Sequence, residues 1–277
     1  MNILLDHQTV YTFSNPVFLE PHILKFKPRQ DPRQQLKNFE IKILPEPVGR
    51  HEFLDEYDNQ SELVWFNGEH PKLTIETKSN LEIFEVNPFG FLIFPFENNQ
   101  MPIHYSSSDS LNKYLKISVD QTNTHVYAKQ LMNDFGSNTM DFLLAVTKKL
   151  HEEIEKTVRH SGPPHPPDRT ISDREGSCRD LAVLEMEILR KAGFATRFVS
   201  GYKFNDEEEN HELHAWVEVY IPGPGWMGFD PSTGLSTAGN YIAVSSSFSP
   251  ADTMPVSGTF RGNAEADMQS KIWIEKF

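Results

Sequence analysis

The chain has 277 residues, 38% of them hydrophobic, and a formal net charge of −13 at pH 7. This negative charge would repel a phosphate backbone, and no basic stripe interleaved with aromatics opposes it, so we expect no nucleic-acid partner. The single cysteine, Cys178, excludes an internal disulfide and a zinc site built from several thiolates.

The first part of the chain, residues 1–95, contains short strand-like runs and little helical periodicity. The runs span residues 8–13, 23–26, 39–44, 62–66 and 73–86. The prolines up to residue 71 fall mostly between these runs, where a missing amide donor disturbs a strand ladder least. These features predict an all-β N-terminal domain such as a β-sandwich.

A change of pattern marks the predicted domain boundary. Residues 87–109 are irregular and interrupted by prolines, so we place the boundary at residue 95 and assign 96–277 to a second unit. Within residues 139–158, Phe142, Val146 and Leu150 recur at helical spacing, with charged residues on the opposite face. This pattern predicts an amphipathic helix packed against a core.

A proline-rich segment follows this helix. Residues 160–168 include four prolines, which remove backbone donors and bias their predecessors away from helical angles, so we predict a loop. His160 and His165 lie in this segment, but no third ligand type stands at a useful spacing. We therefore predict no metal site there.

Cys178 lies where the next helix should begin. Ser177 is a good N-cap residue with Asp180 three positions on, and Gly193 is a natural terminator, so a helix is predicted from Cys178 to about residue 191. The N-terminus of a helix lowers the pKa of a thiol and so favours the thiolate. A nucleophile and a buried core cysteine both fit this position.

Two strands and an acidic turn come next. We predict a strand over 195–204, a solvated hairpin tip over the acidic run 205–210, and a second strand over 213–220. Strict alternation places His214, Trp216, Glu218 and Tyr220 on one face of that second strand. His211 and His214 lie three positions apart and so point to opposite faces, which argues against a shared zinc ion.

A short strand over 226–230 ends at Asp230, before a proline. The hairpin formed with the preceding strand is short enough to bring Asp230 beside His214. A carboxylate in that position would hold the imidazole in the correct tautomer. Cys178, His214 and Asp230 are therefore the candidate nucleophile, base and orienting carboxylate. Trp216 and Trp226 are predicted to be core residues rather than site residues.

Several motifs together resemble bacterial transglutaminase-like proteins. The core motifs are GSCRDLA at 176–182, LRKAGFATRFVSGY at 189–202, HAWVEVY at 214–220, GW at 225–226 and FDP at 229–231. Residues His7, Thr9, Tyr11, Pro16, Val17, Pro28, Arg29, Gln34 and Gln35 resemble the β-rich N-terminal region of many of these proteins. Residues 252–262 resemble their C-terminal segment, so the similarity covers nearly the whole chain.

This resemblance implies an α+β fold, in which a papain-like transglutaminase core carries the cysteine helix on an antiparallel sheet behind an all-β N-terminal domain. It implies that Cys178 attacks an amide carbonyl to form a thioester, while His214 shuttles the proton and Asp230 orients His214. The Cys178 amide would contribute to the oxyanion hole, and the residue supplying a second donor is not identified. A protein or peptide substrate is expected, and no cofactor.

Several functions fit such a site. We favour a cysteine peptidase or amidase over a cross-linking transglutaminase, because water meets the thioester more often than a positioned amine does. A non-catalytic binding or assembly protein with a relic triad is a further alternative, although all three triad members are present. No secretory signal or bilayer-spanning run is visible, so we expect a cytoplasmic protein without a membrane partner. The oligomeric state stays open.

Overall fold

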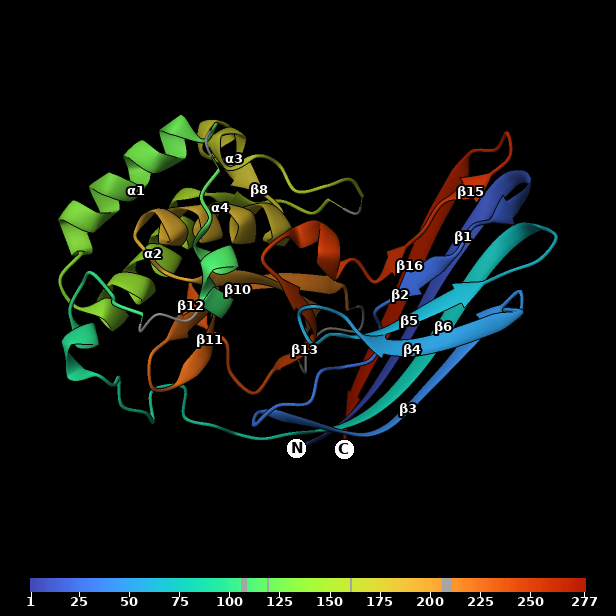
Figure 1. Cartoon of the computed structure of the whole chain (residues 1–277), viewed down its shortest axis with the longest axis horizontal. Coiled ribbons are helices and arrows are strands. Elements are labelled where there is room, and N and C mark those ends of the chain that lie inside the picture. The colour runs from blue at the N-terminus through green and yellow to red at the C-terminus, as the bar shows by residue number, and fades with distance from the viewer. Residues whose placement is uncertain (106–108, 119, 160, 206–210) are drawn as a thin grey trace.

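The N-terminal part of the computed structural model consists of two antiparallel sheets (Figure 1). The larger sheet contains β1 (Asn2–Leu19), β3 (Gln34–Leu44), β6 (Glu69–Ile83), β15 (Phe260–Arg261) and β16 (Ala266–Lys276). The smaller sheet contains β2 (His22–Leu24), β4 (Gly49–Leu54), β5 (Gln60–Trp65) and β14 (Val256–Ser257). The structure describes all residues except 106–108, 119, 160 and 206–210. The prediction of a strand-rich N-terminal region is confirmed.

The long strand β1 buries one face along most of its length, because side chains alternate across a strand, and this alternation is interrupted at the register shift between Thr12 and Val17. Near its start, Ile3 and Leu5 pack with Tyr202 from the second half of the chain. Farther along, Phe13 and Val17 pack into the cluster that lies between the two N-terminal sheets. The large sheet therefore supports both the small sheet and the second half of the chain.

The C-terminal strand completes this N-terminal sheet. β16 pairs antiparallel with β1 from Ile3↔Lys276 to Phe13↔Ala266, and the two chain ends lie side by side (Figure 1). The domain boundary at residue 95 stays a prediction. The hydrogen bonds of β16, however, join this strand to the sheet of the predicted N-terminal domain, although its residues were assigned to the second domain, 96–277. The strand is almost entirely exposed, so it carries little of the apolar alternation by which a strand is found in a sequence.

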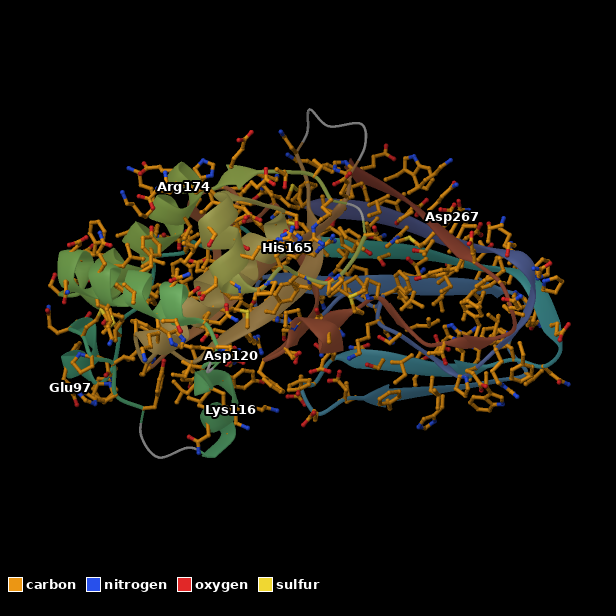
Figure 2. The ribbon with its side chains drawn as sticks, turned by 90° about the horizontal axis from the view of Figure 1, so that it is seen from above. Glu97, Lys116, Asp120, His165, Arg174 and Asp267 are labelled. Atoms are coloured by element: carbon orange, nitrogen blue, oxygen red, sulfur yellow. The ribbon has the colours of Figure 1, made fainter. Side chains whose placement is uncertain are left out.

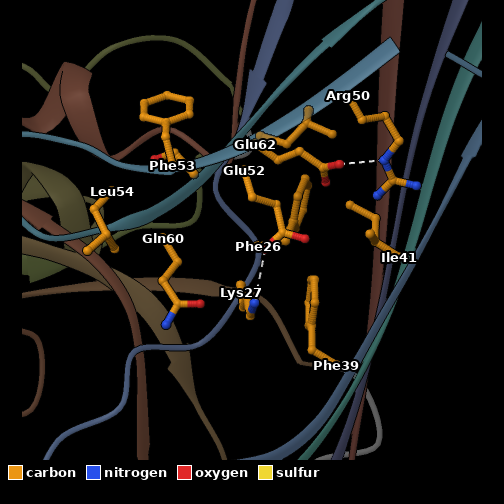
Figure 3. Close-up of a pocket in the computed structure, with 12 residues that line it drawn as sticks. Phe26, Lys27, Phe39, Ile41, Arg50, Glu52, Phe53, Leu54, Gln60 and Glu62 are labelled. Carbon is orange, nitrogen blue, oxygen red and sulfur yellow. Dashed lines mark hydrogen bonds and ion pairs between the residues drawn. The ribbon is translucent and has the colours of Figure 1, made fainter. Parts of the chain in front are cut away.

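A cavity of about 510 Å³ opens between the strands β3 and β4, at the edges of the two sheets (Figure 3). Its apolar lining includes Phe26, Phe39 and Ile41, and its polar lining includes two ion pairs, Arg50 with Glu62 and Lys27 with Glu52. All of its lining residues precede residue 63. The cavity is therefore separate from the candidate site described below.

The second half of the chain is a helical layer on a five-stranded antiparallel sheet (Figure 1). The sheet order is β12 (Leu235–Ser236), β11 (Gly225–Asp230), β10 (Leu213–Ile221), β9 (Thr196–Lys203) and β13 (Tyr241–Ser247). The helices are α1 (Thr122–Phe135), α2 (Thr139–Glu153), α3 (Pro167–Asp173) and α4 (Cys178–Lys191), with 3-10 turns at Phe96–Asn99, Asp109–Leu115 and Pro250–Thr253. Among the described residues, no helix is both long and apolar enough to span a bilayer.

Helix α4 lies at the centre of this half. Leu181, Leu184 and Ile188 are fully buried and share one cluster with Val217 and Val219 of β10. The apolar spacing of the helix thus places it against the sheet, as predicted. Its C-terminal end is also as predicted, because Gly193 takes a positive φ of 92° that suits glycine.

Helix α2 ends earlier than its periodicity predicts. The expected range was 139–158, whereas the helix stops at Glu153. The next residues form β7 (Glu155–Lys156), which pairs in parallel with β8 (Glu175–Gly176) immediately before α4. This long-range pairing replaces the last helical turn and attaches the end of α2 to the segment that carries Cys178.

A buried polar network joins the two halves. Arg29 donates two hydrogen bonds to Glu218 of β10, at 3.2 and 2.6 Å, and Arg197 of β9 donates to the same carboxylate at 2.7 Å. These charges hold the pKa of Glu218 well below its usual range, although burial alone would raise it. His7 of β1 is hydrogen-bonded to the Tyr202 hydroxyl at 2.7 Å. The N-terminal sheets are thus fixed to the same strands that carry the candidate site.

Candidate active site

Cys178 is the first residue of α4, and its side chain is half-buried. One oxygen of the buried Asp180 carboxylate accepts hydrogen bonds from the Ser177 amide at 2.8 Å and the Ser177 hydroxyl at 2.6 Å. The predicted pairing of Ser177 with Asp180 is therefore present, with the carboxylate as acceptor. The thiol lies at the positive end of the helix dipole, which favours the thiolate.

His214 lies between Cys178 and Asp230. Its Nε2 is 2.8 Å from Oδ2 of Asp230, and its ring is hydrogen-bonded to the Cys178 thiol. Because Nε2 is engaged by Asp230, Nδ1 is the nitrogen that faces the sulfur. The ring stacks on Trp216 at a centroid distance of 6.3 Å, and the backbone amide of Ala215 donates to Cys178. The structure thus brings the three predicted residues together.

The Asp230 carboxylate is fully buried and held by several donors. Besides His214, the Tyr241 hydroxyl donates to Oδ2 at 2.7 Å and the Ser232 amide donates to Oδ1 at 2.9 Å. Tyr241 also packs edge-on against Trp216. Tyr241 was not among the predicted site residues, because it lies on β13, which no motif connects to the cysteine helix.

The charges of these three side chains depend on one another. Burial raises the pKa of the Cys178 thiol, but the hydrogen bond and positive charge of His214 outweigh it, so the pKa falls below its usual value. Burial would lower the pKa of His214, yet its hydrogen bonds to Asp230 and Cys178 raise it to about 9. Burial likewise opposes ionisation of Asp230, but the bond to His214 lowers its pKa to about 2. A thiolate–imidazolium pair is favoured at neutral pH.

The proline-rich loop is tied to the start of α4 through Asp180. The second oxygen of this carboxylate accepts from Arg159 Nη2 at 2.5 Å and from the His165 amide at 2.6 Å. In the view of Figure 2, His165 falls between the helices and the strand that carries Asp267. The predicted loop over 160–168 ends where α3 begins at Pro167. Asp180 therefore connects this loop with the helix that carries Cys178.

We predict that Asp180→Asn destabilises the fold by about 2–3 kcal/mol, because a neutral amide cannot serve all four donors and leaves Arg159 without its countercharge. The free energy of unfolding in urea measures this loss. The matched control is Asp173→Asn, whose exposed pair with Arg169 should contribute under about 1 kcal/mol. Equal effects of the two substitutions would contradict a special role for Asp180.

Other residues singled out in the sequence lie elsewhere. Trp226 packs edge-on against Tyr114 and Tyr220, away from the cysteine, whereas Trp216 contacts His214. The backbone of His211 forms a bridge with Ile272 of β16. In the ranges that the structure describes, no three His, Cys, Asp or Glu side chains gather so that they could hold a metal ion. Most of the acidic run over 205–210 lies outside the described residues.

Two family models match this chain. The model of the bacterial transglutaminase-like N-terminal region matches residues 3–82, and that of the transglutaminase-like superfamily matches 113–231, a span that contains Cys178, His214 and Asp230. The chain belongs to the transglutaminase-like superfamily. This membership agrees with the resemblance found in the motifs, and the helical layer on an antiparallel sheet is the superfamily core.

Similar proteins cover the chain to different extents. The protein ML0607 of Mycobacterium leprae is 20% identical, over 98% of this chain and 97% of its own length. A protein-glutamine gamma-glutamyltransferase of Pseudomonas aeruginosa is 32% identical over 73 residues, which are 24% of this chain and 11% of that protein. The crystal structure of a proposed cysteine protease from Cytophaga hutchinsonii matches with a TM-score of 0.76 and 19% identity, covering 100% of this chain and 91% of the other. This last match confirms the fold.

Proposed function

We propose that the protein is a thiol-dependent acyl-transfer enzyme that acts on peptide or amide bonds as a cysteine peptidase or amidase. One observation carries this proposal. The His214 ring is hydrogen-bonded through Nε2 to the buried Asp230, and it is also hydrogen-bonded to Cys178 at the start of α4. A nucleophile, a base and an orienting group in this order are what covalent acyl transfer requires.

In the first half of the proposed reaction, the Cys178 thiolate attacks the amide carbonyl carbon. The negative charge moves to the carbonyl oxygen, where the backbone amide of Cys178 can donate a hydrogen bond. As the C–N bond breaks, the His214 imidazolium gives its proton to the leaving nitrogen. The amine departs and the acyl group stays on Cys178 as a thioester.

In the second half, neutral His214 takes a proton from water, and the resulting hydroxide attacks the thioester carbonyl. Collapse of this intermediate breaks the C–S bond and releases the carboxylic acid, and the thiolate–imidazolium pair is restored. Asp230 stays ionised throughout, because its low pKa and its bonds to Tyr241 and Ser232 stabilise the carboxylate. No cofactor enters these steps.

The acceptor that resolves the thioester decides between two activities. A lysine amine in place of water would give an isopeptide bond and make the protein a transglutaminase. We propose hydrolysis, because water reaches a half-exposed cysteine without a dedicated binding site. The transglutaminase alternative is kept because of the relative from Pseudomonas aeruginosa, which matches only a short stretch. We also propose that the substrate is a protein or peptide and that the protein is located in the cytoplasm.

The test is to incubate the protein with a mixture of peptides that includes glutaminyl peptides, with and without a primary amine, and to analyse the products by mass spectrometry. We expect peptide or side-chain amide hydrolysis that is absent from Cys178→Ala. Incorporation of the amine would favour the transglutaminase activity. No turnover together with saturable peptide binding in both proteins would favour the binding protein with a relic triad.

A further inference from the structure

Arg179 is the residue next to the candidate nucleophile in the sequence. It follows Cys178 on α4, and its Nη2 donates to the backbone oxygens of Arg159 and Ser161, both at 2.7 Å. Its Nε is buried and has no hydrogen-bond partner among the described residues. In the described part of the chain, both acceptors of this guanidinium are neutral carbonyls, so no direct ion pair neutralises it.

The neighbouring carboxylate of Asp180 does not form that ion pair. Its Oδ1 accepts from Arg159 and the His165 amide, and its Oδ2 accepts twice from Ser177. The guanidinium groups of Arg159 and Arg179 thus both lie near the Asp180 carboxylate, whose two oxygens already accept four hydrogen bonds. Burial, followed by repulsion from Arg159, lowers the pKa of Arg179 from its usual value, and the attraction to Asp180 and then to Cys178 opposes this shift.

The Arg179 guanidinium is a positive charge next to the candidate site in a protein whose formal net charge is −13. It lies at the start of α4, where the helix dipole adds further positive potential. A guanidinium is a strong, directional donor to carboxylates. Nη1 of Arg179 donates to no described residue, so this nitrogen can bind an incoming anion.

We propose that Arg179 is a specificity-determining residue that makes the site selective for substrates with a carboxylate close to the scissile amide. This inference rests on the proposed function, because it presumes that Cys178 attacks the substrate. The carboxylate can belong to an acidic side chain or to a free C-terminus, since a guanidinium recognises both by the same chemistry.

Two alkylating reagents test this proposal without a known substrate. The Cys178 thiolate displaces iodide from anionic iodoacetate or from neutral iodoacetamide, and mass spectrometry of the intact protein measures both rates. We expect Arg179→Gln to lower the ratio of the iodoacetate rate to the iodoacetamide rate about five- to tenfold at low ionic strength. The matched control, Arg169→Gln on α3, should leave the ratio unchanged, and Arg179→Lys should retain most of it.

The ratio of the iodoacetate rate to the iodoacetamide rate shows whether Arg179 binds an anion or has only a structural role. If Arg179 only holds the loop, Arg179→Gln will change both rates equally, and the unchanged ratio overturns the proposal. A fall of the ratio in Arg179→Lys as large as in Arg179→Gln also overturns it, because lysine keeps the charge. Slow alkylation of wild type by both reagents at pH 6 would contradict the proposed function instead, and the ratio is then measured at pH 9.

Peptide substrates distinguish the two sources of the carboxylate. Once turnover is detected, peptides with glutamate or glutamine next to the scissile bond are compared, each as a C-terminal acid and as a C-terminal amide. Selectivity for glutamate that is lost in Arg179→Gln indicates an acidic side chain, and selectivity for the free acid indicates a C-terminus. Equal kcat/KM for all four peptides in wild type contradicts the proposal.

Discussion

Iodoacetamide is expected to alkylate Cys178 at pH 6 about a hundredfold faster in the wild-type protein than in His214→Ala. An ordinary thiol with a pKa of about 8.5 is only about 0.3% ionised at this pH. The hydrogen bond and charge of His214 lower the pKa of Cys178, whereas burial alone would raise it. Without His214, rapid alkylation should therefore begin only at alkaline pH.

Mass spectrometry of the intact protein measures the alkylation rate from pH 4 to 10. The two pH profiles compare wild type with His214→Ala. His70→Ala is the matched control, because His70 lies on β6 of the N-terminal sheet, where its imidazole is hydrogen-bonded to the Asn67 carbonyl, and should not affect Cys178. If wild type and His214→Ala show the same profile, Cys178 is an unactivated core thiol. The binding protein with a relic triad would then be the better description.

Asp230→Asn is expected to lower kcat/KM about 10²- to 10⁴-fold on the peptide substrates found in the product screen. The amide cannot stabilise the imidazolium, so the pKa of His214 should fall from about 9 toward its ordinary value. A less basic His214 is a poorer partner for the thiolate, and the pKa of Cys178 should rise in consequence. The alkylation profile of this variant should therefore move to higher pH.

Tyr241→Phe should cause a smaller loss of kcat/KM than Asp230→Asn. It removes one of the hydrogen bonds to Oδ2 of Asp230 but leaves the charge, so we expect a fall of only about two- to tenfold in kcat/KM. Equal activity of wild type and Asp230→Asn would contradict the role of Asp230. An effect of Tyr241→Phe as large as that of Asp230→Asn would mean that the hydrogen bonding of Asp230, rather than its charge, is decisive.

The local parts of the site were predictable from the sequence. Ser177, Asp180 and Gly193 indicate where α4 begins and ends, because caps and terminators act within a few residues of the chain. His214 and Asp230 lie on two adjacent strands joined by a short turn, so their approach also follows from local spacing. The resemblance to transglutaminase-like proteins added the thioester chemistry and the oxyanion-hole role of the Cys178 amide.

The supporting contacts were not predictable in the same way. Tyr241 reaches Asp230 only because β13 lies at the edge of the central sheet, and β16 joins β1 across the whole length of the chain. The early end of α2 likewise depends on the pairing of β7 with β8. None of these three contacts changes the apolar periodicity from which helices and strands are predicted.

The sequence by itself determined the strand-rich N-terminal region, the helix that presents Cys178 and the strands that carry His214 and Asp230. Only the tertiary structure decided which groups stabilise the charges of that cluster, how Asp180 and Arg179 hold the proline-rich loop, and how Arg29 fixes β10 to the N-terminal sheets. The physical reason is one of range. Periodicity and capping act over a few residues, whereas desolvation and hydrogen bonding of buried charges depend on surfaces that meet only when the layers pack.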